Sequence, residues 1–154
     1  MGVQLPERHE SRTAARVVRR SPSARQSTPP PEITAAIEEI VALLDGEARD
    51  LSGIALDLEG VADFDRRVYE VARTIAPGET MSYGAIAARI GEPGAARGVG
   101  QALGRNPFAI VVPCHRVVAA DGGLGGFSAV GGSATKRRML AIEGAAVAPP
   151  TLFG

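Results

Sequence analysis

The stretch MSYGAIAARIGEPGAARGVGQALGRNP, residues 81–107, has the pattern of two short helices joined by a tight turn. Ser82 is suited to cap the first helix, because its hydroxyl can accept a hydrogen bond from a free backbone amide. The turn falls at 91–94, where two glycines and a proline interrupt the helical pattern. Apolar residues four positions apart would pack each helix onto a core: Ile86 and Ile90, then Val99 and Leu103. The pattern predicts a helix-turn-helix motif.

The second helix of this motif would carry a polar stripe on an otherwise low surface. Arg97, Gln101 and Arg105 are four residues apart and face away from the Val99 and Leu103 side. A second group is small and would let another backbone approach closely: Ala95, Ala96, Gly98 and Gly100. This composition suits a helix that contacts DNA, although on this pattern alone a tight contact with another helix is the simpler explanation.

Upstream of the motif the sequence predicts two more helices and one short strand. Apolar residues at helical spacing begin at Ile33 and stop before Gly46, and a second such run extends over 64–75. Between them, apolar residues alternate with Ala, Asp and Glu over 54–59, which predicts a half-buried strand closed by Gly60.

Downstream, an apolar run of β type covers 108–112 and must end at Pro113, since proline cannot donate to a central ladder. Extended chain resumes at 117–118, and the glycine-rich stretch 121–126 predicts a hairpin or a mobile loop. We expect a last helix from Ser133, acting as N-cap, to the neighbourhood of Glu143-Gly144.

The formal net charge of zero hides an uneven distribution of charge. Residues 1–30 carry six Arg and two Glu, giving +4, and residues 81–154 also reach +4, with six Arg and one Lys against three acids. Residues 31–80 carry four Arg against twelve acids, giving −8. The positively charged C-terminal half, which contains the cysteine, could bind a polyanion. An ordinary solvated surface explains the same charges equally well.

The first thirty residues are rich in Arg, Ser and Pro, show no apolar periodicity and end in a run of prolines, so we expect a flexible tail. No stretch approaches 18 consecutive apolar residues, and the start lacks the apolar core of a signal peptide. We therefore expect a soluble, cytoplasmic protein.

Cys114 is the single cysteine, which excludes an intramolecular disulfide, and with only two histidines a zinc cage is hard to assemble. Cys114 lies in Val-Pro-Cys-His-Arg-Val, where His115 and Arg116 could raise the thiolate fraction of a thiol whose ordinary pKa is about 8.5. In a regular strand Cys114 and His115 would point to opposite faces, so they can cooperate only across a turn. Glu143 is the best-placed carboxylate type to orient an imidazole.

Four motifs together resemble one known family. They are RGVGQALGRNP (97–107), VPCHRV (112–117), GGLGGFS (122–128) and KRRMLAIEGA (136–145), and the upstream LDLEG and GETMSYGAIA fit as well. Over about 33–145 the chain is similar to the C-terminal domain of the O6-alkylguanine-DNA alkyltransferases.

This resemblance implies a mostly α fold with short β elements, in which a winged helix-turn-helix-like domain follows a truncated N-terminal segment. The implied segments are a disordered basic tail at 1–31, a remnant of the N-terminal domain at 32–60, a catalytic DNA-binding domain at 61–147 and a flexible C-terminus at 148–154. The implied activity is DNA repair by irreversible, single-turnover alkyl transfer from O6-alkylguanine to Cys114. No cofactor or metal is implied. The implied partner is double-stranded DNA, which the protein would bind in the minor groove with the damaged base flipped out. The protein would act as a monomer, and no membrane is implied.

The resemblance also implies catalytic roles for five residues. Cys114 would accept the alkyl group, His115 would remove its proton through a water, and Glu143 would orient His115. Asn106 would brace the turn behind the cysteine, and Tyr83 would help to flip the nucleotide and donate a proton to the departing guanine.

Further roles follow for the DNA interface and the base pocket. Arg97 would enter the duplex and fill the space that the flipped base leaves. Other DNA contacts would come from Ala96, Gln101 and Arg105, together with Tyr83. Backbone groups of Cys114 and Val117, with Ser128, would hold the guanine edge. Arg116 and Phe127 would also line this pocket.

The sequence departs from the family pattern at two places. It has Phe64-Asp65 and Tyr69 where Phe-Gln and Trp are usual, and it reads GFSAVGG where Gly-Phe-Ser-Gly-Gly is usual. Three other hypotheses stay open: a lesion sensor that binds alkylguanine without repairing it, a cysteine hydrolase that uses Cys114 and His115, and a helix-turn-helix regulator without chemistry.

Overall fold

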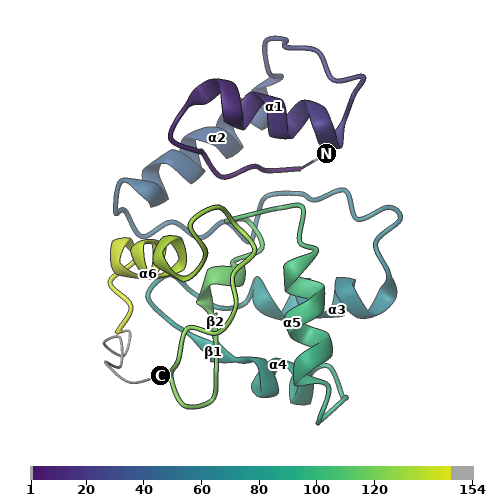
Figure 1. Ribbon diagram of the computed structural model, residues 1–154, viewed down its shortest axis with the longest axis vertical. Coiled ribbons are helices and arrows are strands. Elements are labelled where there is room, and N and C mark those ends of the chain that lie inside the picture. The colour runs from purple at the N-terminus through teal and green to yellow at the C-terminus, as the bar shows by residue number, and fades with distance from the viewer. Residues whose placement is uncertain (1, 147–154) are drawn as a thin grey trace.

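The computed structural model describes residues 2–146, and over this range the chain is mostly helical with a small parallel sheet (Figure 1). In chain order the elements are α1 (Glu10–Arg20), α2 (Pro31–Leu44), α3 (Asp63–Ala72), β1 (Met81–Ser82), α4 (Tyr83–Arg89), α5 (Ala96–Gly104), the 3-10 helix η1 (Cys114–Arg116), β2 (Val117–Val118) and α6 (Gly132–Ile142). The predicted mostly α fold with short β elements is confirmed.

The two helices and the turn predicted over 81–107 are confirmed as α4 and α5. Ser82 caps α4, because its Oγ accepts a 3.1 Å hydrogen bond from the backbone amide of Ala85. Gly91 and Gly94 have φ angles of 80° and 101°, a left-handed conformation that glycine adopts without steric cost. The chain can therefore reverse sharply between the two helices.

The two strands hold the cysteine next to this helix pair. Met81 pairs with Val117 and Ser82 with Val118 in a parallel ladder. β1 runs directly into α4, and β2 directly follows η1, whose first residue is Cys114. The ladder therefore fixes the turn that carries Cys114 beside the start of α4.

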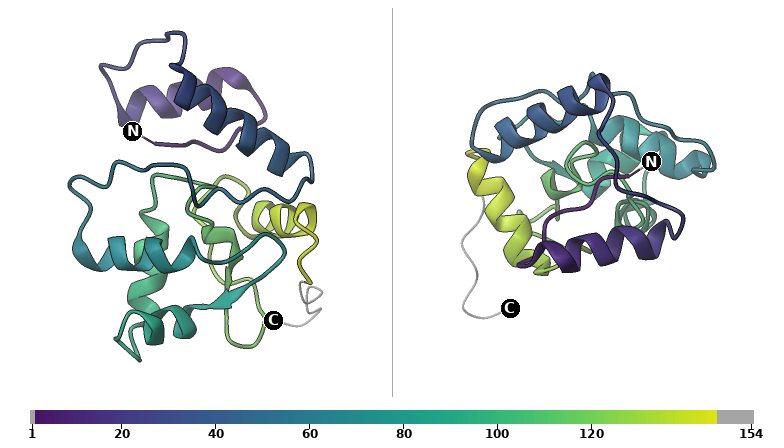
Figure 2. Two further views of the ribbon diagram at one scale, coloured as in Figure 1. Left: turned by 180° about the vertical axis from the view of Figure 1, so that it is seen from behind. Right: turned by 90° about the horizontal axis from the view of Figure 1, so that it is seen from above.

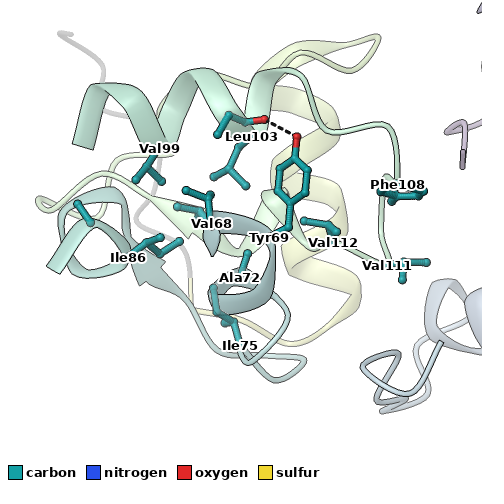
Figure 3. Close-up of a cluster of buried hydrophobic side chains, with 13 residues drawn as sticks. Val68, Tyr69, Ala72, Ile75, Ile86, Val99, Leu103, Phe108, Val111 and Val112 are labelled. Atoms are coloured by element: carbon teal, nitrogen blue, oxygen red, sulfur yellow. Dashed lines mark hydrogen bonds between the residues drawn. The ribbon is translucent and has the colours of Figure 1, made fainter. Parts of the chain in front are cut away.

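A single hydrophobic cluster joins α3, α4, α5 and the segment that leads to Cys114 (Figure 3). Tyr69, which takes the place of the usual Trp, is 2% exposed, and its hydroxyl donates a 2.9 Å hydrogen bond to the carbonyl of Ala102. Burying each Val, Leu, Ile or Phe side chain of this cluster contributes about 1.5–3 kcal/mol to the free energy of folding. The cluster contains Val68, Tyr69, Ala72, Ile75, Ile86, Ala87, Val99, Ala102, Leu103, Phe108, Val111, Val112 and Val117.

The strand predicted at 54–58 does not form. This segment is irregular, and the guanidinium of Arg73 donates to the carbonyls of Leu51, Ser52 and Ile54 at 3.4, 2.5 and 2.6 Å. A strand needs a neighbouring strand for its backbone groups, and here an arginine side chain supplies the donors instead.

The apolar run at 108–112 is a turn and not the strand that its composition predicts. Ile110 has a φ of 74°, and the amide of Val112 donates a 2.9 Å hydrogen bond back to the carbonyl of Phe108. Only isolated bridges remain, Val3 with Phe108 and Ala109 with Val112. In a strand, neighbouring side chains would point to opposite faces. The turn instead lets the apolar side chains of this short segment pack inward.

The structure differs from the disordered tail expected at 1–31, because residues 2–31 contain α1 and pack on the rest of the chain. The amide of Val3 donates a 2.8 Å hydrogen bond to the carbonyl of Pro107, and Leu5 is 9% exposed in a second apolar cluster with α2 and α6. Two isolated apolar residues are too few to show in a periodicity, yet they anchor the segment. The boundaries of the other predicted segments stay predictions, and the flexible C-terminus expected at 148–154 lies outside the described residues.

α6 begins at Gly132, and its N-cap is Gly131, with a φ of 87°, two residues before the predicted N-cap Ser133. Its C-terminal end, at Glu143-Gly144, is close to the prediction. Among the helices of residues 2–146, none has the length and apolar character that a membrane crossing requires.

Candidate active site

Cys114 lines an open cavity of about 540 Å³ that is bordered by α5, the start of α4 and the loop after β2. Its backbone amide donates a 2.8 Å hydrogen bond to the carbonyl of Val112, which tightens the turn that Pro113 begins. The lining residues are Tyr83, Ala96, Arg97, Gly100, Gln101, Leu103, Gly104, Cys114, Gly126, Phe127 and Ser128. Seven of the predicted site residues are therefore brought together around one hollow.

His115 and Glu143 meet behind the cysteine, as expected. His115 Nε2 lies 2.8 Å from Glu143 Oε1, and their side chains are 0% and 2% exposed. His115 Nδ1 is buried and has no hydrogen-bond partner within residues 2–146. The carboxylate thus binds one ring nitrogen and leaves the other free to accept a proton.

Arg116 does not line the base pocket, which corrects the prediction. Its guanidinium is buried and donates to both carboxylate oxygens of Glu143 at 2.9 and 2.8 Å and to the carbonyl of Ile75 at 2.6 Å. The tight 3-10 turn directs Cys114 toward the cavity and Arg116 into the interior. Val117 is also fully buried in the core, and only its carbonyl takes part in the site.

Burial and hydrogen bonds set the charge of this network. Burial raises the pKa of the Glu143 carboxyl, but hydrogen bonds from His115 and Arg116, together with the positive charge of Arg116, outweigh it and lower the pKa to about 2. Burial lowers the pKa of His115, although Glu143 opposes this shift. Near neutral pH the network therefore holds an ionised Glu143 and a neutral His115.

Asn106 braces the turn behind the cysteine, where it was expected. Its Nδ2 donates a 3.0 Å hydrogen bond to the carbonyl of Val112, and its Oδ1 accepts one of 2.8 Å from the amide of Phe108. Burial raises the pKa of the Cys114 thiol, while the hydrogen bond with Asn106 and the charge of Lys136 act in the opposite direction.

Lys136 is a site residue that sequence reasoning missed. It is fully buried, and its Nζ donates to the carbonyl of Val117 at 2.5 Å and to the hydroxyl of Tyr83 at 3.3 Å. Burial lowers its pKa to about 8. One signal could have found it: it is the single lysine in a chain with sixteen arginines.

Tyr83 stands between this lysine and the cavity. Its hydroxyl donates to the carbonyl of Gly126 at 3.4 Å, and burial, followed by the nearby Cys114, raises its pKa. Gly125 has a φ of 65°, and a Cβ there would come within 2.9 Å of the Tyr83 hydroxyl. The glycine-rich loop can therefore lie directly against the tyrosine.

The polar stripe of α5 divides into two parts. Arg97 is exposed at the mouth of the cavity, and Gln101 also lines it. Arg105 instead makes a bidentate ion pair with Asp65, with bonds of 2.9 and 2.8 Å. Asp65 is one of the departures from the family pattern, and here it ties α3 to the end of α5. The expected contact of Arg105 with DNA remains a prediction that competes with this pair.

Lys136→Met is expected to slow reaction at Cys114 by roughly tenfold to hundredfold, because a nearby positive charge favours the thiolate. Stability should change little, since the carbonyl of Val117 loses a donor at a cost of about 1–3 kcal/mol but an ammonium group no longer has to be buried. The rate of Cys114 alkylation by iodoacetamide against pH would show the change as a shift to higher pH. Arg138→Met, on the exposed side of the same helix, is the control, and identical pH profiles for all three proteins would contradict the role of Lys136.

Stability is expected to fall as the pH drops from 7 to 3. The unfolded chain binds protons at His115 below its ordinary pKa of 6.5 and at Glu143 below 4.5, whereas the folded chain resists both because both pKa values are lowered, that of Glu143 to about 2. The unfolded state therefore gains protons first, and unfolding becomes easier. Urea unfolding midpoints at pH 7, 5.5 and 4 measure this, and a constant midpoint would contradict it.

Comparison with known proteins gives one consistent family. A sequence model described as 6-O-methylguanine DNA methyltransferase, DNA binding domain, matches residues 63–145. The methylated-DNA–protein-cysteine methyltransferase of Mycolicibacterium paratuberculosis is 50% identical over 114 residues, which are 74% of this chain and 67% of that protein. The Mycobacterium tuberculosis protein of the same name is 47% identical over 134 residues, which are 86% and 79% of the two chains.

Solved structures agree with these relatives. The crystal structure of Mycobacterium tuberculosis OGT in complex with DNA is similar with a TM-score of 0.67 and 46% identity, over 79% of this chain and 74% of that one. The O6-methylguanine-DNA methyltransferase from Pyrococcus kodakaraensis has a TM-score of 0.72 and 32% identity, over 94% and 85% of the two chains.

Proposed function

This chain belongs to the 6-O-methylguanine DNA methyltransferase family, and we propose that it repairs DNA by moving the alkyl group of O6-alkylguanine onto Cys114. The observation that carries the assignment to this residue is the joint placement of Cys114 in a cavity and of a buried His115–Glu143 pair directly behind it. DNA is the partner, and the chemistry is direct reversal of the damage by transfer to a cysteine.

The thiol is activated from behind. Because Glu143 accepts a hydrogen bond from Nε2, the lone pair of His115 is on Nδ1. A water between Nδ1 and the thiol would carry the proton of Cys114 to His115 and leave a thiolate. Asn106 and Lys136 favour that thiolate through a hydrogen bond and a positive charge.

The transfer itself is a displacement at the alkyl carbon. The bond from Cys114 sulfur to carbon forms while the bond from that carbon to O6 breaks, and the electron pair leaves with guanine. Tyr83 would donate its proton to the departing base, and Lys136 beside it would stabilise the resulting phenolate. The product is a thioether, which thiol exchange does not reverse, so each molecule reacts once.

The base must leave the duplex before it can react. The O6-alkyl carbon is stacked inside DNA, and extruding the nucleotide costs a few kcal/mol. α5 would enter the minor groove, where its small residues permit close approach and exposed Arg97 would fill the vacated space. One chain supplies every residue named for the reaction, so we propose that the protein acts as a monomer on double-stranded DNA.

Intact mass after incubation with a duplex that contains O6-methylguanine tests the proposal. The expected result is the gain of one methyl group on the peptide that carries Cys114, with guanine restored and no second turnover. An identical duplex with plain guanine is the control. Lesion binding without any gain in mass would replace the proposal with the lesion-sensor hypothesis.

Arg97→Leu is expected to slow repair of duplex DNA by roughly tenfold to hundredfold, because the flipped state loses the side chain that offsets part of its cost. The rate on free O6-methylguanine base should not change, since no flipping is needed. Single-turnover rates on both substrates measure this, with Arg66→Leu on α3 as the control. An equal loss on both substrates would place Arg97 in the chemistry and not in flipping.

A further inference from the structure

The N-terminal helix α1 is strongly basic and is not a core element. It carries four arginines and one glutamate, and none of its residues is buried. Arg12, Arg16 and Arg20 are four residues apart and so share one side of the helix. The side chains of Arg12, Arg19 and Arg20 are exposed, and they make no ion pair or hydrogen bond within residues 2–146. The fold does not require their charge.

This helix lies on the same side of the molecule as α5. In Figure 1 both face the viewer, and the view from behind in Figure 2 has α2 and α3 in front instead. Arg16 and Arg20 line a hollow that also contains Cys114, Phe127 and Ser128. These last three residues also line the candidate active site. The basic side of α1 therefore borders the cavity beyond the C-terminal end of α5.

The position of α1 is fixed by contacts that leave its other arginines free. Glu7 pairs with Arg16 at 2.9 Å, and the amide of Glu7 donates a 2.9 Å hydrogen bond to the hydroxyl of Thr13. Just before this, Val3 bonds to Pro107 and Leu5 is buried. The segment is thus attached to the turn that precedes Cys114.

The distribution of charge points in the same direction. Residues 1–30 and 81–154 each carry +4, whereas residues 31–80, which include α2 and α3 on the opposite side, carry −8. A polyanion is attracted to the side that bears α1 and α5 and is repelled from the other. An extruded nucleotide also brings its own two phosphates to the rim of the cavity that receives the base.

We propose that α1 is a second DNA-binding element, whose arginines, Arg12 and Arg20 first among them, contact the phosphates that flank the flipped nucleotide. This inference rests on the proposed function, because it places the lesion in the cavity next to Cys114. α5 positions the duplex and α1 holds the backbone of the damaged strand on the far side of the pocket. Such contacts add affinity without sequence preference.

The salt dependence of DNA binding tests this element. The test uses the double variant Arg12→Gln with Arg20→Gln on a Cys114→Ser background, which prevents reaction. This protein is titrated with a fluorescent O6-methylguanine duplex at salt concentrations from about 50 to about 300 mM, which span the physiological range. The slope of log K against log salt should become shallower by about 1.8, since each phosphate contact contributes about 0.9. Affinity near 0.1 M salt should fall by roughly tenfold.

The control is Arg49→Gln with Arg66→Gln, which removes the same charge from a half-buried and an exposed position outside α1 and α5. The proposal requires that this control has the same slope of log K against log salt as the Cys114→Ser background. It also requires equal melting temperatures for the background, the α1 variant and the control. An unchanged slope in the α1 variant, or an equal change in the control, overturns it. Methyl uptake by the wild-type chain is measured separately, so that failure of repair is distinguishable from failure of the α1 contact.

Discussion

Cys114→Ser is expected to abolish methyl transfer completely while lesion binding stays within roughly twofold of wild type, because only the nucleophile is lost. A serine hydroxyl has the size of the thiol but holds its proton far more tightly, and the neutral His115 behind it has a pKa that burial lowers further. His115 therefore deprotonates the more acidic thiol far more readily than a serine hydroxyl in the same place. Intact mass and fluorescence anisotropy on the same O6-methylguanine duplex measure the two quantities.

The control for Cys114→Ser is Ser133→Ala, an exposed position near the start of α6, which should react and bind as the wild type does. Methylation of the Cys114→Ser protein at another residue would contradict the assignment of the acceptor. Loss of lesion binding at an unchanged melting temperature would show that the sulfur also holds the substrate.

Local periodicity was sufficient for the helices from α2 onward, but it missed α1 and was insufficient for the strands expected at 54–58 and 108–112. α4 and α5 follow from apolar residues four apart, a capping serine and a glycine turn, all within 27 residues, 81–107. The runs at 54–58 and 108–112 have β-type composition, yet a strand also needs a partner that no local pattern supplies. In the first run the guanidinium of Arg73 donates to the backbone carbonyl of Ile54. In the second run the chain forms a tight turn instead of a strand.

Within the site, the structure brings together several residues that the sequence singled out, and their roles in the reaction stay predictions. A lone cysteine beside a histidine suggested a nucleophile, and the structure places Glu143 against that histidine. Arg116 was misassigned, because only the 3-10 turn reveals that it points inward. Lys136 was missed because lysine is seldom buried, and a lysine on a helix is ordinarily solvent-exposed.

Glu143→Gln is expected to slow methyl transfer by roughly 10² to 10⁴ fold, the usual contribution of general base catalysis. Glutamine is isosteric, but its neutral amide no longer favours the proton that His115 must accept. The same change should lower the free energy of unfolding by about 3–5 kcal/mol, because it leaves the buried guanidinium of Arg116 without its counter-ion. Single-turnover kinetics and urea unfolding measure the two effects, with the exposed Glu70→Gln as control.

The double variant Glu143→Gln with Arg116→Met separates the two consequences of losing Glu143. Removing the guanidinium also removes the unpaired charge, so a large part of the lost stability should return. The transfer rate should not return, since His115 still lacks its carboxylate. If stability and rate recovered together, the slow transfer of Glu143→Gln would reflect a disturbed fold; if only stability recovers, Glu143 acts on the chemistry through His115.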